Sequence, residues 1–419
     1  MPIERHRRDR PLRVVMLIPY DLEYQPFTIR TAMFARELVK RGHHVQVFFR
    51  KMAESKRGNR VHFSLPEGCE AREVHGFTRP RAWRDMAAIV RDADVIHFQK
   101  SLPPSTQVAL VLGHWLDRPI HQDWDDYEFA FWSQAARDAW RSDAPLGRRL
   151  IKTSRAAIAA VVTGSMEWLI PKTVDTLGGA SMFLRKKSIQ WGADPADVFP
   201  ARVGVDSERF RPDRRSEDLR ARLGLSGPTV LFAGSFDVHP DLVFFAESLR
   251  VLFHEAPEAQ CLVVGGGFGR SRLADLLGSG LPPRAIVMTD GLVPFHEMPA
   301  YVASADIAAL PFRDTPVNRC KSSLTLLEAM ASGLPCVSHD VGDIGWMLGD
   351  GGVIAPHADP RAFGRILAEL ARDPERRGLL GRQARERAAG RFSWEASVDY
   401  LEEAYYAGIA KRTASGGPR

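Results

Sequence analysis

Runs of consecutive apolar residues alternate with amphipathic segments along the first half of the chain. Each apolar run has the length of a β-strand, and the intervening segments place apolar residues three and four positions apart, as helices do. Continuous apolar strands separated by helices are typical of a parallel sheet covered on both faces. The expected strands are residues 13–19, 44–50, 92–100 and 118–124, and the expected helices are residues 29–42 and about 105–116.

The same alternation begins again in the second half. Two consecutive doubly wound α/β units are the simplest arrangement that accounts for both series. The boundary is expected within 204–216, where the apolar periodicity is lost. The further expected strands are residues 228–237, 259–267, 284–291, 307–312, 334–339 and 351–356.

These patterns predict four parts of the chain. We expect a first Rossmann-like domain over 1–205, a second over 206–391, and a terminal helix over 392–410 that packs back on the first domain. Residues 411–419 are expected to form a disordered tail, since they are short of apolar side chains.

The stretch from 318 to 338, NRCKSSLTLLEAMASGLPCVS, predicts a short helix with a carboxylate in its apolar run. Ser322 or Ser323 is the expected N-cap, and Gly333 and Pro335 are the expected stop signals. Glu328 falls at the rim of the apolar face. A surface glutamate paired with a lysine is one interpretation of it, and a ligand contact is the other.

Composition indicates a globular protein with several domains. The 419 residues are 45% apolar and 26% charged. The cysteines lack CxxC spacing, which fits a reducing cytoplasm rather than a disulfide framework or zinc site. We expect no signal peptide at the charged N-terminus and no membrane span in residues 156–170, which contain a glutamate. The cysteines are Cys69, Cys261, Cys320 and Cys336.

The net charge of +6 is unevenly distributed. Counting Lys and Arg against Asp and Glu, residues 1–206 carry +8 and residues 207–419 carry −2. A solvated basic surface explains this, and so does an anionic partner such as a phospholipid surface. Nucleic acid is excluded as a partner because no nucleic-acid-binding motif accompanies the charge.

The second half also carries candidate ligand loops. Ligands of open parallel sheets bind beyond the carboxyl ends of the strands, where glycines allow the backbone to approach them closely. Gly234, Gly266 and Gly342 lie in such loops. The KSSL segment opens the helix described above, and a helix N-terminus beside Lys321 is suited to a phosphate. Glu328, two turns into that helix, is then placed to accept a hydrogen bond from a ribose hydroxyl.

Several of these segments resemble family 4 retaining glycosyltransferases (glycosyltransferase group 1). These enzymes have the GT-B fold, in which two doubly wound Rossmann-like domains face each other across a cleft. The segments in the second half are CLVVGGG, MPAYVASADIAALPF, LLEAMASGLPCVS, GGVIAP and DPERRGLLGRQARERAAGRFSW. Those in the first half match more loosely and are KRGHHVQVF, ASMFLRKKSIQWGAD and GVDSERFRP.

The resemblance implies sugar transfer from a nucleotide diphosphate donor with retention of configuration, without a metal or other cofactor. Its E-x7-E pair places Glu328 at the ribose, while Cys320 replaces the carboxylate that contacts the donor sugar. Ser235 replaces an arginine that neutralises the diphosphate, so Arg313, Arg319 and Lys321 become candidates for that charge. The backbone that contacts phosphate maps to Lys321, Ser322, Ser323 and Leu324.

On the acceptor side, Asp125 corresponds to a histidine that faces the donor sugar in the family. We therefore expect Asp125, Lys321 and Glu328 to form the catalytic set. Arg30, His97 and Asp126 are the other acceptor-side candidates, although a surface role for Arg30 and a structural role for His97 are alternatives. The acidic residues 123–126 have three interpretations, namely a divalent metal site, an acidic loop, or direct hydrogen bonding to sugar.

The sequence therefore predicts a glycosyltransferase of a kind used in polysaccharide biosynthesis, located in the cytoplasm or peripheral on the inner face of the membrane. Its partners would be a UDP- or GDP-type nucleotide sugar and a saccharide, a lipid-linked glycan or a small-molecule acceptor. A sugar-nucleotide epimerase or hydrolase on the same fold is the alternative within enzymes. A catalytically silent scaffold is the alternative from another class, and the Cys320 and Ser235 replacements favour it.

Overall fold

The computed structural model describes residues 10–20, 22, 27–49, 65–74, 80–235, 241–266, 269–278, 285–291 and 293–414. The chain divides into two compact units. Unit 1 consists of the described residues up to Arg202 together with those from Ser397 onward, and unit 2 consists of Val203–Ala396. The sequence had placed the corresponding boundaries after residues 205 and 391.

Unit 1 contains a seven-stranded sheet in the order β3-β2-β1-β4-β5-β6-β7, with every neighbouring pair parallel. The chain order reverses direction between β1 and β4, which makes their carboxyl ends the expected ligand edge of this sheet. The strands are β1 (Arg13–Leu17), β2 (His44–Phe49), β3 (Cys69–Glu73), β4 (Val95–Gln99), β5 (Ile120–Trp124), β6 (Thr176–Gly179) and β7 (Val198–Pro200).

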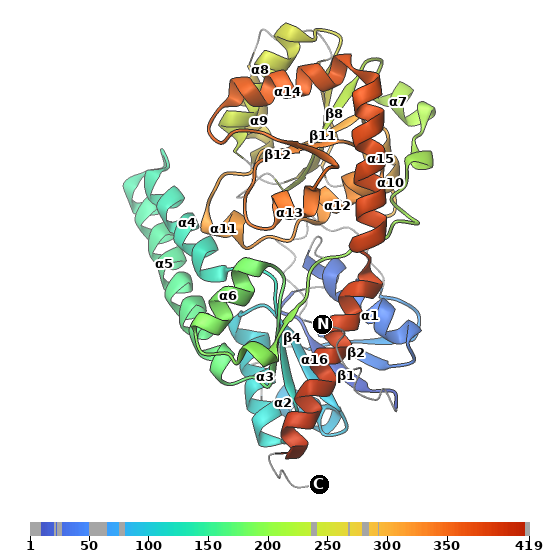
Figure 1. Ribbon diagram of the computed structural model, residues 1–419. Helices are drawn as coiled ribbons and strands as arrows, with labels where there is room; N and C mark the ends of the chain where they lie inside the picture. The colour runs from blue at the N-terminus through green and yellow to red at the C-terminus, as the bar shows by residue number, and fades with distance from the viewer. Residues whose placement is uncertain are drawn as a thin grey trace. The chain divides into compact units, whose positions relative to one another are not determined.

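Helices cover this sheet, and two of them, α4 and α5, pack side by side as a hairpin (Figure 1). A buried cluster between strands and helices includes Leu17, Ile96 and Leu112. The helices are α1 (Phe27–Lys40), α2 (Pro80–Val90), α3 (Pro103–Trp115), α4 (Glu128–Arg141), α5 (Leu146–Leu169) and α6 (Met182–Gln190), followed at the end of the chain by most of α16 (Trp394–Ala414).

Unit 2 contains a six-stranded parallel sheet in the order β10-β9-β8-β11-β12-β13, which reverses direction between β8 and β11. Both sheets thus have the doubly wound topology that the sequence predicted. The strands are β8 (Thr229–Ser235), β9 (Gln260–Gly266), β10 (Ile286–Met288), β11 (Ile307–Leu310), β12 (Cys336–Ser338) and β13 (Gly352–Ile354).

The helices of unit 2 bury a core that includes Phe245, Leu249 and Phe363. The amphipathic stretch 359–390 forms two helices, since Asp373 caps a new helix that opens with Pro374. The helices are α7 (Glu217–Leu223), α8 (Leu242–Glu255), α9 (Gly269–Leu277), α10 (Met298–Ala303), α11 (Pro316–Arg319), α12 (Leu324–Ala331), α13 (Ile344–Leu348), α14 (Pro360–Arg372) and α15 (Pro374–Arg391).

The C-terminal helix α16 extends to Ala414, four residues beyond the predicted end at 410. The predicted disorder therefore does not hold for residues 411–414, and residues 415–419 lie outside the described part of the chain. In unit 1, Tyr405 and Glu402 of α16 are buried against the sheet side, where they bond His97 and His43. Within the described residues, no helix is long and apolar enough to cross a membrane.

Candidate functional site

The carboxyl edge of the unit 2 sheet brings the end of β8 to the start of α12. Gly234 has a φ of +131°, and a Cβ built on it would lie 3.8 Å from the Thr325 hydroxyl oxygen. A glycine here leaves the space between the strand end and the helix N-terminus open. Only the backbone of Ser235 is described, so its side chain and the loop over residues 236–240 lie outside the described part.

The N-terminus of α12 presents backbone donors. Ser323 is the N-cap, and its hydroxyl accepts a 3.3 Å hydrogen bond from the Leu326 amide, as predicted. Among the described residues, the amides of Leu324 and Thr325 have no hydrogen-bond partner, which is normal for the first positions of a helix. The Ser322 hydroxyl accepts a 3.2 Å bond from the Val203 amide. These free amides and the helix dipole favour an anion at this edge.

Three cations lie near this N-terminus in sequence, and the structure separates them. Arg319 makes a two-pronged ion pair with Asp314, with N–O distances of 2.5 and 2.7 Å, and Arg313 lies 3.9 Å from Asp241. The ammonium of Lys321 lies 5.8 Å from the centre of the Phe312 ring, at the end of β11. In the chain, Lys321 is the nearest of the three to the α12 N-terminus, three residues before Leu324.

Two further predicted glycines, Gly342 and Gly266, lie at or after the ends of strands in unit 2. Gly342 follows β12 with a φ of +59°, and any Cβ there would overlap the Arg319 carbonyl oxygen. Its loop is thus packed against the end of α11. Gly266 ends β9, and the loop that follows it is outside the described residues from 267 to 268.

Cys320 is buried, and its thiol donates to the Val317 carbonyl oxygen across 3.0 Å. The side chain therefore serves the packing between α11 and α12.

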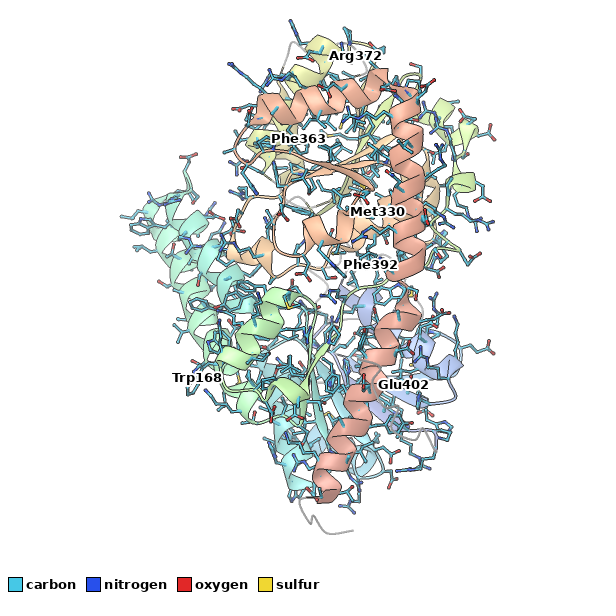
Figure 2. All side chains as sticks on the ribbon, viewed as in Figure 1. Trp168, Met330, Phe363, Arg372, Phe392 and Glu402 are labelled. Carbon is cyan, nitrogen blue, oxygen red and sulfur yellow. The ribbon has the colours of Figure 1, made fainter. Side chains whose placement is uncertain are left out.

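Glu328 lies two turns into α12, on the helix whose Met330 is labelled in Figure 2. The sequence had placed it at the rim of the apolar face, but the side chain is buried, with 6% exposure. Burial raises the pKa of its carboxyl to about 8, and the charge of Arg209 lowers it only in part. In turn, the Arg209 guanidinium stacks 4.4 Å from the centre of the Phe295 ring. The carboxyl is therefore largely protonated at neutral pH until a ligand or a cation favours its charged form.

The carboxyl edge of the unit 1 sheet holds a buried lysine surrounded by acids. Lys100 follows β4, and its ammonium contacts Asp126, lies 3.2 Å from Asp125 and 3.5 Å from Glu128. Asp125 also accepts a 2.8 Å hydrogen bond from the Gln99 amide group. Burial alone would lower the pKa of Lys100, but the three carboxylates raise it well above its usual value. The lysine thus stays charged.

Sequence reasoning singled out Asp125 and Asp126 but missed Lys100. Lys100 has a φ of +66°, an uncommon conformation for a residue other than glycine. Strained backbone of this kind gathers at functional sites. Burial raises the pKa of Glu128 to about 7, with the lysine opposing that shift. The signals available in the sequence were a lysine at a strand end, VIHFQK, and the acidic run DWDDYE after the next strand.

Arg30 and His97 belong to a buried network behind that edge. Arg30 pairs with both oxygens of Asp123, at 2.7 and 2.6 Å, and also donates to the Ala201 carbonyl oxygen. His97 is fully buried, and its Nδ1 lies 2.8 Å from the Tyr405 hydroxyl. Burial, followed by His121 and Arg30, lowers the pKa of His97 well below its usual value, so the ring is neutral. The structure thus places both residues among α1, β4, β5 and α16.

The acidic residues 123–126 are already paired with cations of the chain itself, Asp123 with Arg30, and Asp125 and Asp126 with Lys100. No group of three or more His, Cys, Asp or Glu side chains in the described ranges is arranged to hold a metal ion. None of the four cysteines, which all lie in the described ranges, forms a disulfide bond.

Comparison with known proteins connects this geometry to a family. Residues 227–373, which carry β8 to β13, match the family model described as Glycosyl transferases group 1. D-inositol 3-phosphate glycosyltransferase of Kineococcus radiotolerans is 29% identical over 311 residues, which cover 67% of this chain and 69% of that protein. Alpha-D-kanosaminyltransferase of Streptomyces kanamyceticus is 26% identical over 218 residues, which cover 50% of this chain and 55% of that protein.

Solved structures match over nearly the whole chain. Sucrose-phosphate synthase of Thermosynechococcus elongatus superposes with a TM-score of 0.69 at 19% identity, covering 95% of this chain and all of that one. Anabaena HepE, solved with UDP and glucose, superposes with a TM-score of 0.65 at 14% identity, covering 94% of this chain and all of that one. At these identities the likeness establishes the fold. On these matches the chain is a glycosyltransferase with the GT-B fold, and its residues 227–373 are similar to the group 1 glycosyltransferases.

Proposed function

We propose that the protein transfers a sugar from a nucleotide diphosphate donor to an acceptor, with retention of anomeric configuration and without a metal ion or other cofactor. The observation that carries this proposal is the edge of unit 2, where Gly234, the free amides of α12 and the buried Glu328 lie on adjoining elements. The solved relative with UDP and glucose supports a UDP-type donor as the first to test.

The N-terminus of α12 would hold the donor diphosphate. The amides of Leu324 and Thr325 and the positive end of the helix dipole stabilise the charge that develops on the departing nucleotide. Lys321 would supply a full positive charge in place of the family's arginine, which Ser235 replaces in this sequence. For a retaining transfer, leaving-group stabilisation and positioning of the acceptor on the same face do most of the work.

Glu328 would accept hydrogen bonds from the donor ribose. Its raised pKa fits this role, because hydroxyl donors favour the ionised carboxylate and binding would then release a proton. The neighbouring Arg209 helps to stabilise that charge.

Unit 1 would supply the acceptor side. Asp125 is only partly buried, with its side chain 15% exposed, and it stands at the carboxyl edge next to Asp126 and the charged Lys100. We propose that Asp125 orients sugar or acceptor hydroxyls, and that the acceptor is a saccharide, a lipid-linked glycan or a small molecule. Because Lys100 and Arg30 already pair with the acidic run, its chemistry supports a reaction that needs no divalent ion.

The burial of Cys320 keeps a second candidate open, a scaffold relative that has lost activity. A panel of UDP- and GDP-sugars, read by released nucleotide and by the anomeric proton signals of the product, separates the two. Nucleotide release with a retained anomer supports the proposal. Failure of every nucleotide diphosphate to bind in calorimetry would contradict it and favour the scaffold.

A further inference from the structure

In the α4–α5 hairpin of unit 1, helix α5 carries apolar side chains on its exposed face. The inner face of α5 is formed by Ala156, Ala160, Thr163 and Glu167, which are small or polar and are buried. At 100° per residue, the opposite face carries branched and aromatic side chains, although surface helices usually place polar residues there. Its members Ile158 and Val161 are 64% and 66% exposed.

This exposed apolar face, the hairpin surface, runs along most of α5 and continues on its neighbours. Trp168, labelled in Figure 2 near the end of α5, is 54% exposed. Trp115 at the end of α3, a helix that packs against α5, is 70% exposed. Contiguous apolar patches on a protein surface mark sites of interaction. The hairpin surface consists of Trp115, Leu146, Leu150, Ile151, Ile158, Val161, Val162, Trp168 and Leu169.

The same hairpin is strongly basic. Residues 137–172 contain seven Lys and Arg against three Asp and Glu, and one of those acids, Glu167, is buried. Two of the exposed tryptophans have a cation on the ring, since Arg149 lies 4.9 Å from the Trp140 ring centre and Lys172 lies 3.0 Å from that of Trp168. Arg155 and Arg148 fall along one edge of the apolar face, and Lys152 follows them on the side toward the inner face.

We infer that the hairpin surface docks on an anionic lipid bilayer. Branched apolar and tryptophan side chains interleaved with Arg and Lys are the features of helices that lie in a membrane interface. A second copy of the chain would fit less well, because pairing two hairpin surfaces would bring their arginines and lysines together. Anionic headgroups complement those charges while the acyl boundary covers Ile158 and Val161. The helix would lie on the membrane and not cross it.

The inference is independent of the proposed donor and reaction, so it is tested by binding alone. The full chain is floated with vesicles of phosphatidylcholine and with vesicles that also contain phosphatidylglycerol, at low and at physiological salt. We expect binding to the phosphatidylglycerol vesicles that weakens as salt rises. Binding to neither, or equal binding to both at low salt, would overturn the inference.

Three variants separate the apolar and the charged contributions. Val161→Gln should lower the bound fraction several-fold, while Leu379→Gln, which changes a half-exposed leucine of α15 in unit 2, should leave it unchanged. Arg148→Gln combined with Lys152→Gln should lower partitioning by roughly 25-fold, about five-fold for each charge. Melting temperatures equal to that of the wild type confirm that the variants are folded.

Sedimentation velocity distinguishes the other occupant of this surface. A dimer that Val161→Gln dissociates, together with vesicle binding that the substitution leaves intact, would assign the hairpin surface to a second copy and overturn the inference. A monomer whose vesicle binding is lost in Val161→Gln supports the bilayer.

Discussion

The burial and the pKa of the Glu328 carboxyl are set by residues around it that the helical pattern does not show. The helical pattern correctly places it two turns into α12, but the pattern alone cannot tell a rim position from a buried one. In the structure, the side chain is 6% exposed and the pKa of its carboxyl rises to about 8. A buried acid whose charge is offset only in part by one arginine destabilises the fold, which favours a role for Glu328 in binding.

Glu328→Gln tests that role directly. The amide keeps the shape but cannot form charge-assisted hydrogen bonds, which are worth about 1.5–3 kcal/mol. We expect affinity for the nucleotide diphosphate to fall roughly ten- to hundred-fold, measured by isothermal titration calorimetry. Glu258→Gln, at an exposed position of unit 2, is the matched control and should bind like the wild type. Unchanged affinity in Glu328→Gln would make the glutamate purely structural.

The raised pKa of Glu328 also predicts how stability depends on pH. Its folded-state pKa of about 8 lies above the unfolded value of 4.5. The protonated form therefore stabilises the fold fully below pH 4.5, and this contribution is lost as the pH rises through 8. We expect the melting temperature of the wild type to fall relative to that of Glu328→Gln between pH 5 and pH 9. A constant difference across that range would show that the carboxyl is not buried in solution.

Asp125→Asn addresses the acceptor side. The substitution keeps the hydrogen bond from Gln99 within reach but removes one negative charge from the Lys100 cluster. We expect turnover to drop while calorimetric affinity for the nucleotide diphosphate stays the same, since an interaction made mainly in the transition state appears in kcat. Loss of nucleotide binding in this variant would place Asp125 on the donor side instead.

At the scale of elements, the helix ends that are set by capping residues could be predicted from the sequence. Ser323 caps α12, and Gly333, with a φ of +77°, follows its last turn, so both ends of this helix could be read from the residues alone. The apolar strands of both sheets were found within a few residues, except for the three-residue edge strand β7, VFP. The edge strand β3 was missed because its sequence, CEARE, is largely exposed and has no apolar run. The strand β6, TLGG, was missed because its two glycines leave no apolar run of strand length.

The buried pairs could not be predicted, because they join residues that only the fold brings together. Arg30 and Asp123 are 93 positions apart in the chain, and Lys100 meets its carboxylates from the next strand. The sequence named Asp125 and Asp126 and left a metal site open. Predicting that Lys100 meets these carboxylates would have required the register between β4 and β5, in which Gln99 lies beside Asp123.

Lys100→Met measures how much the cluster of Lys100 and its three carboxylates contributes to the stability of unit 1. Removing the ammonium leaves Asp125, Asp126 and Glu128 facing one another without a cation, and breaking a buried ion pair in this way costs about 3–5 kcal/mol. We expect a clear fall in the denaturant midpoint of unfolding. Lys186→Met, at an exposed position of α6, should change it by less than about 0.5 kcal/mol. Equal midpoints in the two variants would mean that the cluster is solvated and weak.

For the whole molecule, the arrangement of charges predicts a reaction that tolerates chelation. The acidic run of unit 1 is paired with Arg30 and Lys100, and in unit 2 the diphosphate would meet helix amides and Lys321. We expect nucleotide release to continue at an unchanged rate in EDTA. Complete loss of turnover in EDTA, restored by manganese or magnesium, would contradict the proposed metal independence.

The path of the chain through its two units has a consequence for the order in which they form. Unit 1 is closed by α16, whose Tyr405 bonds His97 and whose Glu402 bonds His43, although residues 203–396 of unit 2 intervene. A ribosome therefore releases all of unit 2 before unit 1 receives its last helix. The described residues of unit 2 form one segment and can complete their core during synthesis. Unit 1, in contrast, must wait with His43 and His97 uncovered until α16 has been synthesised.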